Sequence, residues 1–121
     1  MINCLFAGIG GFIGTVCRYL IGLIPLEHSS GFPFKTLMIN ITGAFLIGLI
    51  TAAAAKNKAL SPQLVTMLKV GICGGFTTFS TFAYETTDLI HSGKPILALV
   101  YVLTSTVLGT LAVFGALLLA K

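Results

Sequence analysis

The sequence predicts an all-α integral membrane protein with four transmembrane helices, the third of which is broken near its middle. Of its 121 residues, 56% are hydrophobic and 8% are charged, whereas soluble domains carry roughly 25% charged residues. The hydrophobic residues gather in four runs, each long enough for the roughly 20 residues that a membrane helix needs. These runs cover residues 3–24, 36–55, 63–90 and 96–120. Their length and lack of alternation argue against transmembrane strands, so we expect a single four-helix membrane domain over residues 1–121.

The first run combines closely spaced glycines with one cation. Gly10 and Gly14 form a GxxxG pattern, which is typical of a tight helix-packing seam. Arg18 follows on the same helix, where a buried charge is costly, so it must face protein or water or reach the nearby interface. The residues leave two roles open for Arg18: a topological anchor, or an anion-attracting residue of an aqueous vestibule.

The second run follows a loop marked by Pro25, Gly31 and Pro33. It contains one strongly polar side chain, Asn40. An amide in hydrocarbon must find partners, so Asn40 either bonds to another helix or lines a pathway. The residues alone favour the interhelical bond.

The third run contains the most unusual stretch of the chain, residues 71–82. Three glycines lie within five residues there, and each weakens a helix by about 1 kcal/mol relative to alanine. Four hydroxyl residues follow, interleaved with phenylalanines. Bare backbone at membrane depth is tolerated where protein buries it or where it lines a polar cavity, and such breaks recur at ion and substrate sites. The alternative is a close-packed helix crossing.

Polar residues continue after this stretch and into the fourth run. If the segment is helical, Phe79 and Phe82 project from one side and Glu85 from an adjacent one. An intramembrane acid is functional by default, although a structural hydrogen bond to Thr81 is an alternative. In the fourth run Tyr101 and Ser105 share a face, but hydroxyls often bond back to their own helix.

The distribution of charged residues does not determine the orientation of the chain in the membrane. The formal net charge is +4, but the basic residues are scattered, which excludes nucleic acid as a partner. With four spans, one side of the membrane carries Lys56, Lys58, Lys69 and Lys121, and the other carries Arg18, Lys35 and Lys94. A tally of four against three is almost neutral under the positive-inside rule. Such a chain can insert both ways, which allows antiparallel dimers, and four short helices need an oligomer to enclose a polar pathway.

The chain closely resembles the Fluc (CrcB-type) fluoride channels. The resemblance rests on the central run Gly71–Ile72–Cys73–Gly74–Gly75–Phe76–Thr77–Thr78–Phe79–Ser80–Thr81–Phe82. It extends over the whole chain, through residues 10–14 with Arg18–Tyr19, Asn40 with Thr42–Gly43, and Glu85. Length and helix count also agree with that family.

The resemblance implies a passive, fluoride-selective channel, built as a dual-topology homodimer with one subunit inverted and two pores. It also implies a structural sodium ion at the dimer interface, held by main-chain carbonyls of Gly74 and Thr77, and assigns Arg18 to the vestibule. The fluoride pathway that it implies comprises Asn40, Phe79, Ser80, Thr81, Phe82, Glu85, Tyr101 and Ser105. The implied location is the plasma membrane of a bacterium, with lipid, fluoride and an inverted copy of the chain as partners.

The physical chemistry agrees with this assignment. Fluoride is small and strongly hydrated, so a pore must replace its water with donors, and hydroxyls, an amide and the electropositive edges of phenylalanine rings can do so. A fixed cation in the constriction would bind the ion too tightly for rapid conduction. A carbonyl cage suits a hard cation. The residues alone lead to a small-anion pathway, and fluoride comes from the resemblance.

Two other classes remain as alternatives. A proton-coupled exporter of the small multidrug resistance type has the same size, but it needs an acid in the first helix, and none precedes Glu27. A non-transporting membrane assembly subunit would use the glycines and hydroxyls for packing alone. An enzyme is not expected, because no nucleophile–base pair or metal cluster is present.

Overall fold

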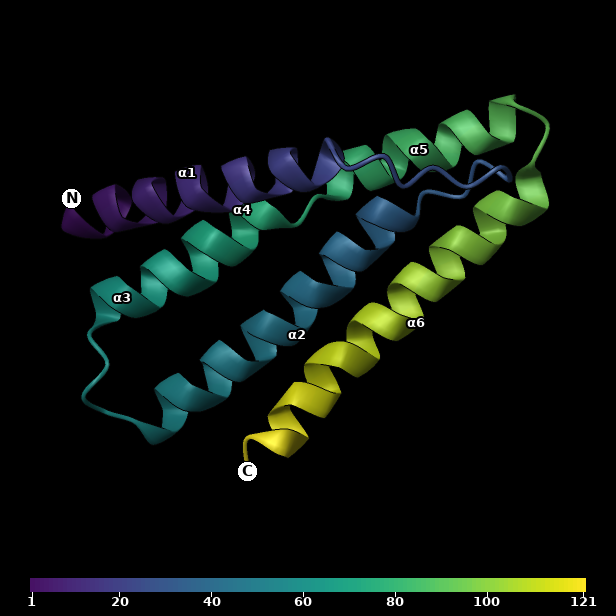
Figure 1. Cartoon of the computed structure of the whole chain (residues 1–121). Coiled ribbons are helices and arrows are strands. Elements are labelled where there is room, and N and C mark those ends of the chain that lie inside the picture. Colours follow the sequence, from purple (N-terminus) through teal and green to yellow (C-terminus); the bar gives the residue numbers. More distant parts are fainter.

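The computed structural model describes residues 1–121 and is entirely helical (Figure 1). Its helices are α1 (Ile2–Gly22), α2 (Phe34–Lys56), α3 (Pro62–Thr66), the π-helical segment η1 (Met67–Cys73), α4 (Gly74–Phe76), α5 (Phe79–His91) and α6 (Pro95–Leu119). Four segments are long and apolar enough to cross a membrane: α1, α2, the composite run Pro62–His91, and α6. The prediction of four membrane helices is therefore confirmed.

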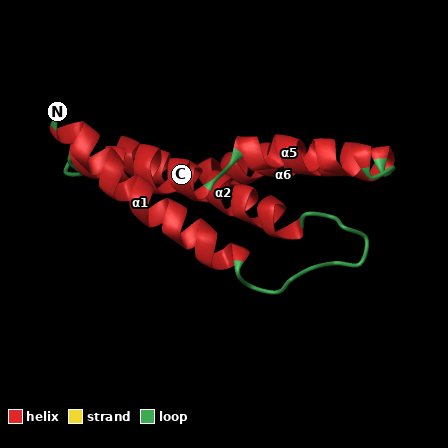
Figure 2. Ribbon diagram, turned by 90° about the horizontal axis from the view of Figure 1, so that it is seen from above, coloured by secondary structure: helices red, strands yellow, loops and turns green.

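The spans form two packed pairs. Helix α1 lies along η1 and α4, while α2 lies along α6, and α5 packs against α6 (Figures 1 and 2). Gly10 and Gly14 are the buried residues of α1, and a Cβ atom at either would collide with backbone carbonyls of Met67 or Ile72. The GxxxG pattern is thus a packing seam, as predicted.

The third span is broken, but not at the glycines. Gly74 and Gly75 belong to α4, and the chain becomes extended only at Thr77 (φ −79°, ψ 162°) and Thr78 (φ −150°, ψ 122°). The glycines serve close packing instead, since a Cβ atom at Gly75 would lie 2.6 Å from the carbonyl oxygen of Gly11. A break at Gly74–Gly75, which the weak helix propensity of glycine predicts, is therefore wrong in its location, because the helix continues through these glycines to Phe76.

Few side chains are buried within one protomer. Only 13 of the 121 residues are buried, and most large apolar side chains are exposed, as expected where lipid or another subunit covers them. The one compact cluster lies where the loop between α1 and α2 meets α5 and α6. It comprises Phe32, Leu37, Leu89, Ala98 and Tyr101.

Candidate ion pathway

The side chain of Asn40, on α2, bridges the break in the third span. The backbone N–H of Thr78 donates to Asn40 Oδ1 at 2.8 Å, and Asn40 Nδ2 donates to the Thr78 carbonyl at 3.1 Å. One amide therefore satisfies both backbone groups of a residue that has left the helix. The interhelical bond expected of Asn40 is present, and its partner is backbone.

Side chains of α1 donate hydrogen bonds to the backbone just before the break. The carbonyl of Gly75 accepts from Arg18 Nε at 3.2 Å and from Thr15 Oγ1 at 3.4 Å. The remaining N–H groups of the Arg18 guanidinium make no hydrogen bond within the protomer. Arg18 thus lies beside the break, half-buried, with donors still free.

The hydroxyls of two threonines form local hydrogen bonds at the break. Thr77 Oγ1 donates to the carbonyl of Cys73 at 2.9 Å. The hydroxyl oxygen of Thr78 accepts from the N–H of Thr81 at 3.2 Å and so caps the start of α5. By contrast, the Thr77 carbonyl accepts no hydrogen bond, and no side chain donates to that of Gly74. These oxygens are available to a ligand from outside the protomer.

A cavity of about 410 Å³ lies against the break, between α2, α4, α5 and α6. Its polar lining groups are hydroxyls, the Asn40 amide and backbone, and no lysine, arginine or carboxylate lines it. Among the predicted site residues it gathers Asn40, Gly74, Thr77, Phe79, Phe82 and Ser105, and its other lining residues are Gly43, Ala44, Ile47, Cys73, Thr78, Thr106 and Val113. Residues from four separate segments therefore meet at one hollow.

Aromatic rings form one wall of this region. The rings of Phe79 and Phe82 lie 5.8 Å apart, and Phe82 lies 5.1 Å from Tyr101. Phe79 is 80% exposed, whereas Tyr101 is fully buried. The hydroxyls of Tyr101 and Ser105 are buried without a hydrogen-bond partner. Because buried hydroxyls are normally paired, these two are candidates for binding a ligand.

Glu85 belongs to a separate environment. It accepts a hydrogen bond from Thr36 Oγ1 at 2.5 Å, so its partner is Thr36 and not Thr81. It lines a second cavity of about 280 Å³ with loop residues and Asp88. Ser80 and Thr81 line neither cavity, and Ser80 is exposed on the first turn of α5. The predicted pathway residues therefore do not share one hollow: Glu85 lines the second cavity, and Tyr101 is fully buried and lines neither cavity.

Three residues that the sequence reasoning left out of the site hold it together: Thr15, Thr36 and Thr78. Each of these threonines lies three or four residues from a predicted site residue. Threonines at this spacing are common in membrane helices, so the spacing alone does not mark them as site residues. The capping spacing of Thr78 before α5 is the more specific clue, because Thr78 precedes Thr81 by the three residues that an N-cap bond spans.

The fold and site together define a class. The chain is a multi-pass membrane protein in which a broken helix presents backbone, hydroxyl and aromatic groups to a cavity at mid-span. Residues 5–117 match the family described as "CrcB-like protein, Camphor Resistance (CrcB)". The chain belongs to this CrcB-like family.

Curated relatives agree over nearly the whole chain. The protein named "Fluoride-specific ion channel FluC" of Chlorobaculum tepidum is 46% identical over 121 residues, covering 100% of this chain and 96% of the relative. A protein of the same name from Methanopyrus kandleri is 43% identical over 90% of this chain and 82% of its own length. That from Rhizobium meliloti is 38% identical, covering 100% and 98%.

Proposed function

We propose that this protein is a fluoride-specific ion channel of the cell membrane that lets fluoride leave passively. One observation carries the proposal: six of the residues expected from the family's pattern line a single cavity at the break of a membrane helix. The relatives that match the full chain are named fluoride-specific ion channels. A channel carries no covalent chemistry, so enzymatic activity is not part of the proposal.

The chemistry of the cavity suits a small, hard anion. Asn40 uses one N–H of its amide on Thr78, and an amide nitrogen has a second N–H to offer. The Ser105 hydroxyl and the ring edges of Phe79 and Phe82 supply further donors and positive edges. No lysine or arginine lines the cavity. The donors can therefore bind an anion without a fixed cation that would hold it too tightly for conduction. Arg18, with its free donors, is the candidate for drawing anions toward the entrance.

The finer part of the proposal is a homodimer with one subunit inverted and one pore along each subunit. Within one protomer, the cavity is open and Phe79 is 80% exposed. A second subunit over this face would cover the ring and close the pathway. Ser80, Thr81, Glu85 and Tyr101 would then extend the route beyond the cavity, as the family's pattern expects.

A structural sodium ion between the subunits fits the residues present. The chain has no cluster of His, Cys, Asp or Glu able to hold a metal, so a cation would depend on main-chain oxygens. The Thr77 carbonyl has no hydrogen bond, and nothing lies within 4 Å of an added Cβ atom at exposed Gly74. Hard cations prefer such oxygen ligands. The ion would supply fixed positive charge that stabilises converging carbonyl dipoles.

Fluoride efflux from liposomes tests the proposed function. Purified protein is reconstituted into vesicles loaded with fluoride, and release is followed with a fluoride electrode under a potassium gradient with valinomycin. We expect rapid release of fluoride and almost none from matched vesicles loaded with chloride and read with a chloride electrode. No release would favour a non-transporting subunit, and release that requires a proton gradient would favour a proton-coupled exporter.

A further inference from the structure

The loop between α1 and α2 places one aromatic ring inside the protein. Phe32 is only 9% exposed, although its neighbours on both sides in the chain are more open. Its ring meets the ring of Tyr101 edge-to-face, with centroids 5.5 Å apart and planes at 78°. Phe32 is absent from the lining of the 410 Å³ cavity, and the sequence gives no hint of its role beyond a loop.

Tyr101 is held between two rings from different segments. Phe82, on α5, lies on one side at 5.1 Å, and Phe32, on the loop, lies on another at 5.5 Å. Tyr101 is fully buried, and its hydroxyl has no hydrogen-bond partner. The rings packed against Tyr101 therefore restrict the orientation of its own ring.

The loop is fastened so that Phe32 keeps its place. Lys94 Nζ donates to the Ser30 carbonyl at 2.8 Å, and the Phe32 N–H donates to Ser30 Oγ at 3.2 Å. Gly31 turns the chain with φ +79°, a left-handed conformation that favours glycine. Lys94 directly precedes α6, the helix that carries Tyr101. The bond from Lys94 therefore ties the loop to the same helix that Phe32 contacts.

We propose that Phe32 is a positioning residue for ion conduction, because its ring fixes the ring of Tyr101 and thereby the hydroxyl of a residue on the proposed fluoride route. This inference rests on the proposed function. The loop then does more than join two helices, because it packs a second ring, besides Phe82, against Tyr101. Phe32 also lines the 280 Å³ cavity with Glu85, so the dependence of its effect on Tyr101 is what distinguishes positioning from a direct role.

The test compares fluoride efflux per folded dimer among matched variants. Phe32→Leu keeps apolar volume but removes the ring. Phe34→Leu is the control, because Phe34 is 44% exposed and touches the rings of Phe32 and His28 but not that of Tyr101. We expect Phe32→Leu to lower efflux about threefold or more, the size of a typical contact coupling, while Phe34→Leu retains the wild-type rate. Phe32→Tyr, which restores the ring, should recover most of the loss.

The decisive readout is the dependence on Tyr101. In a Tyr101→Phe background, Phe32→Leu should cost little further efflux, since the hydroxyl that Phe32 positions is gone. Equal losses in both backgrounds, no loss in Phe32→Leu, or no recovery in Phe32→Tyr would each overturn the inference. If Tyr101→Phe alone leaves too little efflux to compare, the recovery by Phe32→Tyr decides. Wild-type protein without fluoride efflux would instead overturn the proposed function, and the inference with it.

Discussion

The amide of Asn40 serves two needs at once. Its oxygen and one N–H satisfy the backbone of Thr78, and each of those groups would cost roughly 1–3 kcal/mol if it were buried without a partner. Its second N–H makes no hydrogen bond in the protomer, and Asn40 lines the cavity. The residue can therefore hold the broken helix and still offer a donor to an anion.

The rings of Phe79 and Phe82 provide the first prediction. Replacing either with isoleucine keeps apolar bulk but removes the electropositive ring edge. If the edges contribute to anion binding, each variant should lose fluoride efflux by about tenfold, as expected for an interaction near 1.4 kcal/mol. Efflux per dimer, with the dimer quantified by gel filtration, is the measurement.

Phe114→Ile is the matched control for these variants. Phe114 lies on α6, is 61% exposed and lines neither cavity, so its replacement should leave efflux unchanged. If Phe79→Ile and Phe82→Ile both behave like Phe114→Ile, the two rings belong to packing and not to the pathway.

At the scale of elements, the third span is held open by its neighbours. Helix α1 supplies donors to the Gly75 carbonyl from Thr15 and Arg18, and α2 supplies Asn40 to Thr78. The helix can end at Phe76 and restart at Phe79 because these side chains replace the lost backbone bonds. The break is therefore a product of three elements and not of local sequence alone.

The glycines of this span provide the second prediction. A Cβ atom at Gly75 would lie 2.6 Å from the Gly11 carbonyl, whereas one at Gly74 meets nothing within 4 Å. Gly75→Ala should therefore push α1 away and lower the thermal stability of the protein. Gly74→Ala should leave the protomer folded, with helix propensity improved by about 1 kcal/mol. If Gly74 faces the partner subunit and the cation, its variant should nonetheless weaken the dimer and lower efflux.

Gly115→Ala controls for the added methyl group, since Gly115 on α6 also has open space around it. Dimer dissociation on dilution, followed by single-molecule or cross-linking analysis, separates the variants. A Gly74→Ala protein with the dimer stability and efflux of Gly115→Ala would argue against a partner or a cation at Gly74.

Several parts of this element structure follow from sequence. Hydropathy and length predict the four spans, because membrane helices must satisfy their backbone internally. The break was expected in the right span but at the glycines, because helix propensity does not reveal that Gly75 is needed for contact with Gly11. The inward turn of Phe32 was not predictable either. Gly31 and Pro33 mark a loop, but only tertiary contacts with α6 show that Phe32 is buried.

At the scale of the whole molecule, the proposed sodium ion provides the third prediction. If free carbonyls of Gly74 and Thr77 hold a cation between subunits, emptying the site should destabilise the dimer, since ligand binding stabilises the state that binds it. Dimers exchanged for a long time into sodium-free lithium or potassium buffer should then dissociate more readily and lose efflux, and both should return with sodium. Full dimer stability and efflux, after sodium analysis shows the ion to be gone, would rule out the structural cation.

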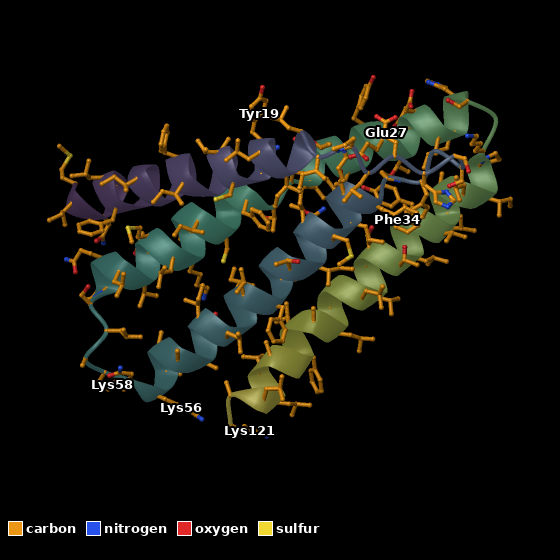
Figure 3. All side chains as sticks on the ribbon, in the orientation of Figure 1. Tyr19, Glu27, Phe34, Lys56, Lys58 and Lys121 are labelled. Atoms are coloured by element: carbon orange, nitrogen blue, oxygen red, sulfur yellow. The ribbon has the colours of Figure 1, made fainter.

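The distribution of charge provides the last prediction. Lys56, Lys58 and Lys121 lie at one end of the molecule, and Glu27 in the loop and Phe34 at the start of α2 lie toward the other (Figure 3). Counting Lys69 with the first group gives four basic residues against Arg18, Lys35 and Lys94, too small a bias to fix orientation. Reporter fusions at Lys121 should therefore show comparable populations on both sides of the membrane.

Changing this balance tests whether both orientations enter one channel. Three lysines added to the turn at Lys56–Lys58 should direct insertion one way and, if the two subunits are antiparallel, abolish most efflux. The double variant Lys56→Gln/Lys58→Gln reverses the tally to two against three and should favour the opposite orientation. Co-expression of the two variants should restore efflux, because each supplies the orientation that the other lacks. Full efflux from the lysine-rich variant alone, with a single orientation shown by its reporter, would refute the antiparallel dimer.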